Sequence, residues 1–450
     1  MDTGASLSRR SLLRAGAAGA VTLAAVAAQG AGAGPAGAAA PAASGPAATG
    51  DVADTGARAV TGAAGTRVAE DGPVRLPVPT GPYAVGTRHL HLVDDRRNDP
   101  FAPTVTPREL MVQVWYPTIG PAASASETSA VSTASAVPAV SAASGYGKGG
   151  RGRAPYLSAG LVPMVERRFT LPQGSLERVR TDARPGAPVH PALRDAPVVF
   201  FGPGRQDPAA TGTAFAQDLA SHGYVVLGVN HTYDGPVEFP DGRVIEQNPA
   251  TGDPALLRKY SDVRAADLSF VLDALTGRRG PGPAPCLTAA VSRERVGVFG
   301  HSLGGSAAAE VMRTDDRFAA GACLDGALQT AAAQTGLTRP FMLFTEPLEL
   351  PSWRDFMAGH RAWGRRMVLA GARHYSFTDL APLGVGLGLA QVWTPEQFAK
   401  YFGTIDGRRS QEVTAAYVRA FFDHRLRGRP APELDDPGSR FPEVTIPWRS

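Results

Sequence analysis

From residue 74 onward, short β-rich apolar runs alternate with longer segments whose apolar residues recur at helical spacing. Strands that alternate with helices predict an α/β fold with a mostly parallel, doubly wound central sheet and helices on both faces. The expected strands are Pro197–Phe201, Tyr224–Val229, Val296–Phe299, Ala319–Leu324, Phe341–Thr345 and Met367–Leu369, and the expected helices are Thr213–His222, Asp253–Thr276 and Thr414–His424.

Two further strands are expected nearer the N-terminus. His89–Val93 and Leu110–Tyr116 alternate between apolar and polar residues, as half-buried strands do, and Asp94–Thr106 would connect them. The longest expected helix has an apolar side formed by Leu256, Leu257, Tyr260, Val263, Leu268, Val271 and Leu272.

Other parts of the 450-residue chain lack the apolar residues that a core needs. Residues 41–73 are mostly Ala, Gly, Pro and Thr, which predicts a disordered spacer, and the Ser- and Ala-rich residues 121–153 are expected to form a surface insertion. The α/β domain would then span residues 74–450.

The N-terminus has the features of an export signal. Arg9 and Arg10 precede a mildly apolar stretch, Ala15–Ala28, which is shorter than the ~18 residues of a spanning helix. We therefore expect residues 1–40 to be a twin-arginine signal, cleaved near Ala38–Ala40, rather than a basic leader or a membrane anchor.

Charge and cysteine content exclude some classes of function. The net charge of +4 is spread along the chain without a basic tract, which argues against a nucleic-acid partner. Two cysteines, Cys286 and Cys323, fit neither a disulfide scaffold nor a zinc site. Export would permit a bridge between them, but Cys323 lies in an expected buried strand and could equally be a free core thiol.

A Gly-x-Ser-x-Gly pentapeptide carries the main chemical signal. It runs from Gly300 to Gly304, is centred on Ser302, follows an expected strand and precedes a helical pattern. In that setting the glycines leave room for a strained turn that exposes the serine hydroxyl, whereas the bare motif arises by chance in a Gly-rich chain.

A nucleophilic serine needs a base and an acid that orients the base. Asp325 follows one expected strand and His374 follows the last one, giving the order Ser, acid, His of α/β-hydrolases. Glu346 follows the intervening strand and competes with Asp325 for the role of the acid. Among other histidines, His301 adjoins the serine and His231 also follows a strand, so both are candidates for the pocket.

Acyl transfer further needs backbone donors for the oxyanion. The residue after the nucleophile, Leu303, would supply one amide. The Gly202–Arg205 loop would supply the other through Arg205, because Pro203 has no N–H, with Gly204 beside it. The simpler interpretation of this loop is an ordinary Gly-Pro turn.

Several of these segments together resemble the plasma-type platelet-activating factor acetylhydrolases and their bacterial secreted esterase and lipase relatives. They are Pro197–Gly204, Leu219–Val226, Val229–Thr232, Gly300–Gly305, Cys323–Gly326, His374–Asp379 and Gly403–Gly407. The resemblance implies an α/β-hydrolase fold and the triad Ser302, Asp325 and His374, with Asp325 preferred to Glu346, and oxyanion amides at Leu303 and Arg205. The Gly-Pro-Gly-Arg loop and the insertion depart from the pattern.

The sequence as a whole therefore predicts an exported serine carboxylic ester hydrolase that needs no cofactor or metal. The resemblance implies short-acyl phospholipid or other lipid esters as substrates, with transient contact to a lipid surface. A polyester- or peptide-cleaving hydrolase and a non-catalytic lipid-binding protein are the alternatives. Leu380–Trp393 would form either a lip of the pocket or a buried loop with a helix start.

Overall fold

The computed structural model describes residues 73–120, 152–280 and 284–450. The expected export signal, nearly all of the spacer and residues 121–151 of the expected insertion lie outside these ranges. No helix in the described ranges is both long enough and apolar enough to cross a membrane.

A ten-stranded sheet runs through the centre of the domain in the order β14-β13-β12-β11-β10-β6-β7-β3-β2-β5. Its strands are β2 (Ala84–Asn98), β3 (Pro107–Thr118), β5 (Arg184–Pro185), β6 (Ala196–Gly202), β7 (Val225–His231), β10 (Val291–His301), β11 (Phe318–Leu324), β12 (Phe341–Thr345), β13 (Gly364–Leu369) and β14 (Val444–Arg449). The six strands from β13 to β7 are mutually parallel, and the pairs β2–β3, β3–β7 and β13–β14 are antiparallel.

Two small sheets and the helices complete the domain. The small sheets pair β1 (Val74–Arg75) with β4 (Val179–Arg180) and β8 (Val237–Glu238) with β9 (Val244–Ile245). The α-helices are α1 (Val162–Phe169), α2 (Thr213–Ser221), α3 (Pro254–Leu275), α4 (Pro285–Ala290), α5 (Leu303–Thr314), α6 (Ala332–Thr335), α7 (Pro351–Gly359), α8 (Leu380–Leu383), α9 (Leu389–Val392), α10 (Pro395–Phe402) and α11 (Gly407–Arg427). The 3₁₀ helices are η1 (Leu176–Arg178), η2 (Ala209–Gly212), η3 (His374–Phe377) and η4 (Pro432–Leu434).

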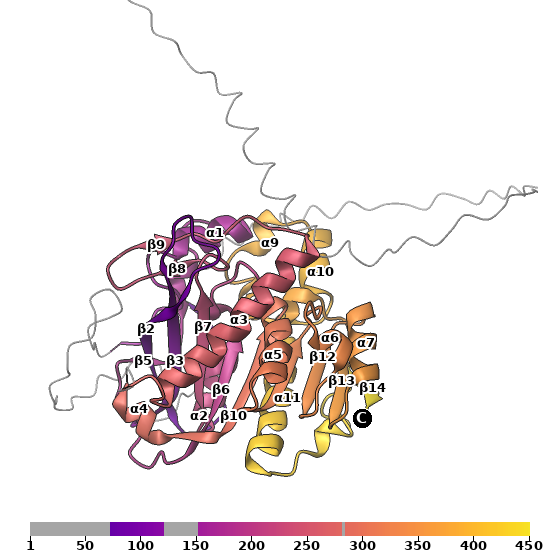
Figure 1. Cartoon of the computed structure of the whole chain (residues 1–450). Helices are drawn as coiled ribbons and strands as arrows, with labels where there is room; N and C mark the ends of the chain where they lie inside the picture. Colours follow the sequence, from indigo (N-terminus) through magenta and orange to yellow (C-terminus); the bar gives the residue numbers. More distant parts are fainter. Residues whose placement is uncertain (1–72, 121–151, 281–283) are drawn as a thin grey trace, which may run out of the picture. The chain divides into compact units, whose positions relative to one another are not determined.

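The core has two layers, one on each face of the sheet. Successive residues of β6 show this, because Val198 and Phe200 pack in the cluster that contains α3 and α5, while Val199 and Phe201 pack with α2 and α11. A strand that is buried on both faces has a continuous run of apolar residues, and this run is why β6 could be predicted from the sequence. Figure 1 shows α3 and α5 crossing the near face of the sheet.

Capping explains where the longest helix begins. The side chain of Asp253 accepts a hydrogen bond from the backbone N–H of Ala255 at 3.0 Å, and Pro254 occupies the first helical position, where no N–H is needed. The helix ends before Thr276, so its expected bounds are confirmed to within one residue at each end.

The doubly wound sheet is confirmed, with corrections to some elements. Strand β2 continues to Asn98, inside the segment expected as a connection, and β14 adds an antiparallel edge strand that the sequence pattern did not predict. Residues 380–393 fold as the short helices α8 and α9, where Leu383 and Leu389 are buried while Val385 is exposed. Both cysteines are free, so the bridge left open by the sequence is absent.

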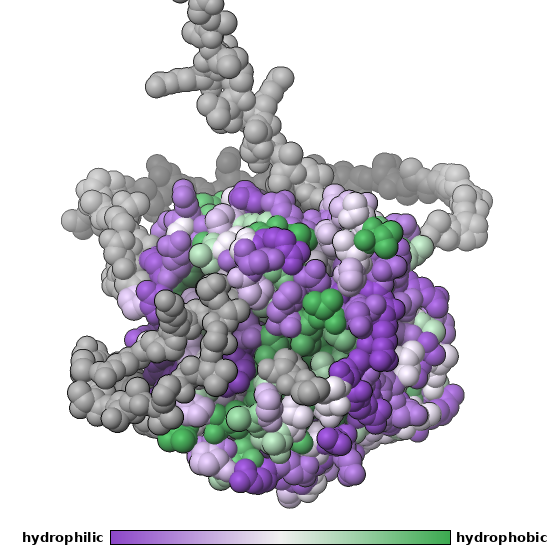
Figure 2. Space-filling view, turned by 60° about the vertical axis from the view of Figure 1, so that its left-hand side comes forward, coloured by the Kyte–Doolittle hydropathy of each residue, from purple (hydrophilic) through white to green (hydrophobic). Residues whose placement is uncertain are grey.

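Large exposed apolar side chains are few on the described surface. They are Val78, Val93, Val105, Ile119, Val244, Leu348, Val385 and Val392. Figure 2 shows one face, on which hydrophilic residues predominate and hydrophobic ones gather toward the middle. Single exposed apolar residues are normal on the surface of a folded domain.

Candidate active site

Four polar side chains stand at the carboxyl ends of four neighbouring parallel strands. Ser302 follows β10, Asp325 follows β11, Glu346 follows β12, and His374 opens η3 after β13. Parallel strands deliver the residues after their carboxyl ends to a single edge of the sheet, which is where ligands bind in open α/β sheets. The strand order alone therefore gathers residues that are up to 72 positions apart in sequence (374 minus 302).

Ser302 occupies a strained turn between β10 and α5. Its φ of 54° and ψ of −123° lie outside the regions that a residue with a side chain ordinarily adopts. The backbone N–H of Ser302 donates to the carbonyl of Leu324 at 2.9 Å, which ties the turn to β11. A strained turn between a strand and a helix is the geometry that the sequence motif predicts for a nucleophile elbow.

The elbow requires glycine because neighbouring backbones touch it. A Cβ on Gly304 would lie 2.0 Å from the carbonyl oxygen of Gly202, and one on Gly300 would lie 2.2 Å from the carbonyl carbon of Gly304. A Cβ on Gly305 would meet the Sγ of Cys323 at 2.3 Å, so the buried thiol fills the space beneath the elbow.

Asp325 holds the imidazole of His374. The Nδ1 of His374 donates to Oδ2 of Asp325 at 2.7 Å, and Oδ1 of Asp325 accepts the backbone N–H of Glu346 at 2.9 Å. The Asp325 side chain is only 2% exposed, so both bonds are shielded from water. With Nδ1 bound to the acid, Nε2 is the ring nitrogen left to accept a proton.

The surroundings of His374 favour its protonated form. Burial lowers the pKa of His374, but the hydrogen bond and charge of Asp325, with the charges of Glu346 and Asp207, outweigh burial and raise the pKa above 6.5. His374 is therefore a stronger base than a free histidine.

Glu346 stands beside this pair without bonding to the imidazole. Its side chain is 14% exposed and forms an ion pair with Nη1 of Arg373 at 3.4 Å. Burial and the charge of Asp325 raise the pKa of Glu346 to about 7. Of the two acids that strand position left open, Asp325 is the one in contact with His374.

The other two histidine candidates lie in different surroundings. His301 is buried behind His374, with its ring centroid 4.5 Å from that ring, and its Nε2 donates to the backbone carbonyl of His374 at 2.9 Å. Burial keeps the pKa of His301 well below 6.5, so it is neutral. His231 is bonded to Asp267 of α3 at 2.8 Å, outside the group that contains Ser302 and His374.

The expected oxyanion loop lies against the elbow. The carbonyl oxygens of Gly202 and Pro203 lie 2.0 Å and 2.7 Å from the place of a Cβ on Gly304. Leu303 is the first residue of α5, where a backbone N–H has no partner within the helix. Neither the Leu303 amide nor the Arg205 amide donates a hydrogen bond within the described part of the chain.

Asp325, Glu346 and His374 could each offer one ligand atom to a metal ion, since these atoms lie within 4.8 Å of one another. A tetrahedral ion at about 2.0–2.1 Å from Nδ1 and Oδ2 would hold those atoms roughly 3.3 Å apart. They are 2.7 Å apart, the length of a charge-assisted hydrogen bond. The arrangement therefore suits a hydrogen-bonded acid and base better than a metal site.

Three charged residues around the oxyanion loop were not singled out from the sequence. They are Arg168 of α1, Asp207, and Arg264 of α3, and Nε of Arg168 donates to Oδ1 of Asp207 at 3.0 Å. One signal was available, because Arg264 lies four residues after buried Tyr260 and four before buried Leu268, on the apolar stripe of the helix.

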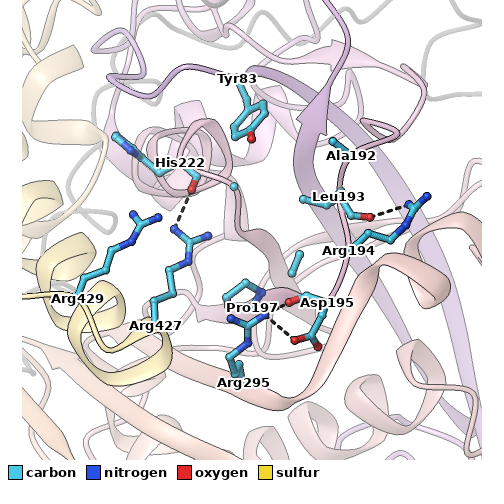
Figure 3. A pocket seen from close by; sticks show the side chains of 12 residues that line it. Tyr83, Ala192, Leu193, Arg194, Asp195, Pro197, His222, Arg295, Arg427 and Arg429 are labelled. Carbon is cyan, nitrogen blue, oxygen red and sulfur yellow. Dashed lines mark hydrogen bonds and ion pairs between the residues drawn. The ribbon is translucent and has the colours of Figure 1, made fainter.

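A separate pocket of about 410 Å³ lies away from this group and contains none of its residues. In Figure 3, Arg427 and Arg429 face it from one side and Arg295 from another. Arg427 donates to the carbonyl of His222 at 2.9 Å, and Arg295 forms an ion pair with Asp195 at 2.7 Å. Because these cations already have partners, the pocket is not a second candidate site.

Known proteins resemble the chain over most of its length, and two of them show this well. The solved structure of a ferulic acid esterase from Streptomyces cinnamoneus is 36% identical with a TM-score of 0.68, and the match covers 84% of this chain and 100% of that one. A probable 1-alkyl-2-acetylglycerophosphocholine esterase of Arthroderma benhamiae is 28% identical over 396 residues, which are 82% of this chain and 93% of that protein. No protein-family model matches the chain.

Proposed function

Because the chain belongs to the α/β-hydrolase esterases, the group that its two relatives represent, we propose that it cleaves its ester substrates through a serine acyl-enzyme. In this proposal Ser302 is the nucleophile, His374 the general base and Asp325 the residue that orients the base. The observation that carries it is the 2.7 Å bond between Nδ1 of His374 and Asp325, at the sheet edge that also presents the strained Ser302.

The first half of the reaction acylates the serine. The Oγ of Ser302 attacks the ester carbonyl while Nε2 of His374 takes the hydroxyl proton, which forms a tetrahedral oxyanion. The amides of Leu303 and Arg205 stabilise this negative charge. The oxyanion then collapses, the bond to the alcohol breaks, and the imidazolium gives its proton to the leaving alcohol.

The second half releases the acid. Water enters, His374 accepts its proton, and the resulting hydroxide attacks the acyl carbon of the acyl-enzyme. When the second tetrahedral intermediate collapses, Oγ of Ser302 leaves and recovers a proton from the imidazolium. The products are a carboxylic acid and an alcohol, and the enzyme returns to its starting state.

Two acyl classes are candidates for the substrate. Short-acyl phospholipid or lipid esters follow from the acetylhydrolase resemblance and from the name of the fungal relative. Aromatic acyl esters follow from the name of the bacterial relative, and aromatic side chains favour them. Tyr375 packs on His374 at 5.6 Å between ring centroids, and Tyr401 continues the contact to half-buried Trp393 at 5.0 Å. Such a wall suits a planar acyl group.

The proposal extends to where the enzyme acts. The paired arginines Arg9 and Arg10 support export by the twin-arginine route, so the substrates would be met outside the cytoplasm. Exposed Val385, which precedes α9, and Val392, the last residue of α9, are the apolar side chains through which transient contact with a lipid surface would occur.

A fluorophosphonate probe tests the nucleophile directly. We expect stoichiometric labelling at Ser302, identified by peptide mass spectrometry, and no labelling of a Ser302→Ala variant. The control Ser306→Ala changes a nearby buried serine in α5. An unlabelled wild-type protein would contradict the serine mechanism and favour a non-catalytic lipid-binding protein.

A substrate panel separates the acyl classes. Aryl esters of increasing chain length, a short-acyl phospholipid and methyl ferulate would be compared by kcat/KM. Preference for methyl ferulate supports the aromatic class, and preference for the phospholipid supports the lipid class. Cleavage of polyester or peptide with negligible turnover of all three would contradict both.

A further inference from the structure

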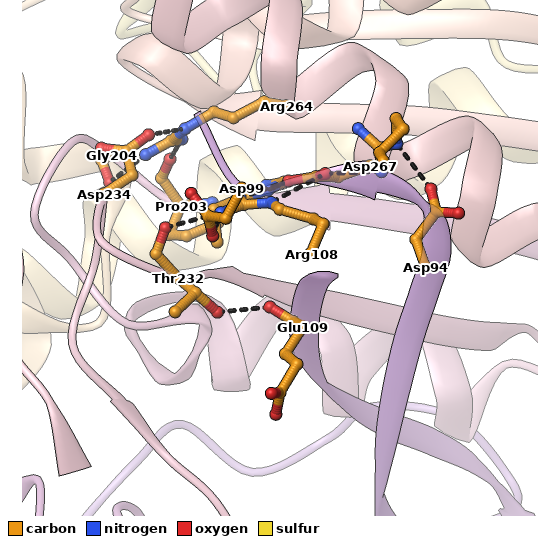
Figure 4. A network of polar contacts seen from close by, with 12 residues as sticks. Asp94, Asp99, Arg108, Glu109, Pro203, Gly204, Thr232, Asp234, Arg264 and Asp267 are labelled. Carbon is orange, nitrogen blue, oxygen red and sulfur yellow. Dashed lines mark hydrogen bonds and ion pairs between the residues drawn. The ribbon is translucent and has the colours of Figure 1, made fainter. Parts of the chain in front are cut away.

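Arg264 is buried in the middle of α3 with its guanidinium directed at the oxyanion loop. Its side chain is 1% exposed, and Nε donates to Oδ2 of Asp234 at 2.5 Å. Nη1 donates to the carbonyl of Pro203 at 2.5 Å and Nη2 to that of Gly204 at 3.2 Å. Figure 4 draws these residues from close by. A buried cation is tolerated when its donors are used in this way, and the planar fork of arginine reaches several acceptors at once.

Holding a carbonyl also fixes the amide on its other side. In a trans peptide, the C=O of one residue and the N–H of the next point in opposite directions. Because Arg264 binds the carbonyl of Gly204, the N–H of Arg205 must point away from α3. That amide donates no hydrogen bond within the described ranges, so it stays available to a ligand.

The rest of the loop is held from a second helix. Arg168 of α1 donates through Nη2 to the carbonyl of Arg205 at 3.1 Å and through Nη1 to the side chain of Gln206 at 2.8 Å. Gln206 has a φ of 65°, and its N–H donates to the carbonyl of Asp234 at 3.1 Å. Three successive carbonyls, those of Pro203, Gly204 and Arg205, thus bind arginine donors and cannot rotate toward the site.

We propose that Arg264 is a positioning residue that orients the Gly204–Arg205 peptide, so that the Arg205 amide is aimed at the oxyanion before substrate arrives. The inference rests on the proposed serine mechanism. Preorganised donors account for a large part of esterase catalysis because they need not reorient as charge develops. Arg264 acts through the loop and touches neither substrate nor reacting atoms.

Arg264→Lys tests the proposal, because a lysine keeps the charge but cannot span three acceptors. We expect kcat per fluorophosphonate-titrated site to fall about 100-fold, as for loss of an oxyanion donor, with KM within about threefold of wild type. A trifluoromethyl ketone, which forms a tetrahedral oxyanion on the serine, should lose affinity in parallel with kcat/KM. Guanidinium ion at millimolar concentration should restore part of the activity of Arg264→Gly.

Arg108→Lys is the matched control. Arg108 is equally buried and bonds Asp267 of α3 at 2.7 Å and Asp99 at 2.6 Å (Figure 4), and its hydrogen bonds in the described ranges go to Asp267, Asp99 and the carbonyl of Thr232 rather than to residues 203–205. Its variant should lower the melting temperature and leave kcat per titrated site within about threefold. An equal loss of kcat in both variants would show that Arg264 only stabilises the fold, and it would overturn the proposal.

The outcomes separate this inference from the proposed function. If the wild type is not labelled at Ser302, the serine mechanism fails and the inference fails with it. If the wild type is labelled and Arg264→Lys keeps its kcat, or shows only a raised KM, the inference alone fails.

If Arg264→Lys does not fold, Asp234→Asn is the deciding variant, because it weakens the ion pair that holds the guanidinium of Arg264. A kcat-specific loss of about tenfold supports the proposal, and an unchanged kcat overturns it.

Discussion

Two carboxyl groups stand beside one imidazole, and their contacts differ. Asp325 bonds Nδ1 of His374 directly, whereas Glu346 donates its backbone N–H to Asp325 and forms an ion pair with Arg373. The aspartate therefore sets the tautomer of His374, and the glutamate acts on it through charge alone.

Replacing each acid in turn distinguishes these roles. Asp325→Asn should lower kcat by about 10⁴-fold, as for the equivalent change in serine proteases, because the amide favours the wrong imidazole tautomer. Glu346→Gln should cost about tenfold or less. Both variants would be checked for an unchanged melting curve and assayed on one short-chain ester. An inactive Glu346→Gln beside an active Asp325→Asn would transfer the role of the acid to Glu346.

The raised pKa of Glu346 predicts a change in pH dependence. In the proposed mechanism ester cleavage needs neutral His374, so kcat/KM should rise with pH as His374 loses its proton. Glu346 ionises near pH 7, and its negative charge then helps His374 to keep its proton. Glu346→Gln removes this charge, which should shift the rising limb of the kcat/KM profile to lower pH. If the rising limb of the Glu346→Gln profile stays in place or moves to higher pH, the charge of Glu346 does not influence the protonation of His374.

Sequence reasoning placed Ser302, Asp325 and His374 because each follows an apolar strand, and parallel strands bring such residues together whatever their separation. Their catalytic roles remain predictions. Arg264 and Arg168 were not predicted in this way, because they lie on helices and bind backbone carbonyls that are distant in sequence. No side-chain pattern shows which carbonyl a buried arginine will reach.

The same contrast holds for whole elements. Strand β12, buried at every position, was located to the residue, and α3 was located by its apolar stripe. Strand β14 was missed because it contains Pro447, which the sequence pattern does not associate with a strand and which is tolerated here at the sheet edge. The charged end of β2 was mistaken for a connection, although Asp94 there is buried by ion pairs with Arg97 and Arg279.

The close approach of the elbow to the oxyanion loop predicts the effect of one methyl group. Gly304→Ala places a Cβ 2.0 Å from the carbonyl oxygen of Gly202, which must move the loop or the helix. Such overpacking typically costs about 1–3 kcal/mol, and displacement of the loop should abolish most of the activity. Gly152→Ala, where nothing lies within 4 Å, is the control. Melting curves and fluorophosphonate labelling would measure both effects, and wild-type labelling by Gly304→Ala would refute the expectation.

On the scale of the whole molecule, the first strand in the described ranges, β1, starts at Val74, and the domain boundaries expected from the sequence stay predictions. Composition identified the segments without large apolar residues, but it says nothing of how they relate to the domain. Arg153, at the end of the expected insertion, pairs with Asp182 at 3.1 Å.

Deletion of residues 124–149 tests whether the insertion supports the domain. Because this segment offers little apolar surface to bury, its removal should leave the melting temperature within about two degrees and ester turnover within about twofold. Differential scanning fluorimetry and an aryl ester assay suffice. A large fall in melting temperature would show that the segment packs on the domain.

The buried thiol of Cys323, which lies beneath the elbow, can report transient local opening of the domain. Burial raises the pKa of Cys323 to about 12, so hardly any reactive thiolate exists while the domain is closed. Cys286 is exposed and should be alkylated at once. The slow phase of alkylation by iodoacetamide would then be that of Cys323, and its rate would measure how often the segment that presents Ser302 opens. A covalent inhibitor on the serine should lengthen that phase, if the reactive turn and the packing beneath it open as one unit.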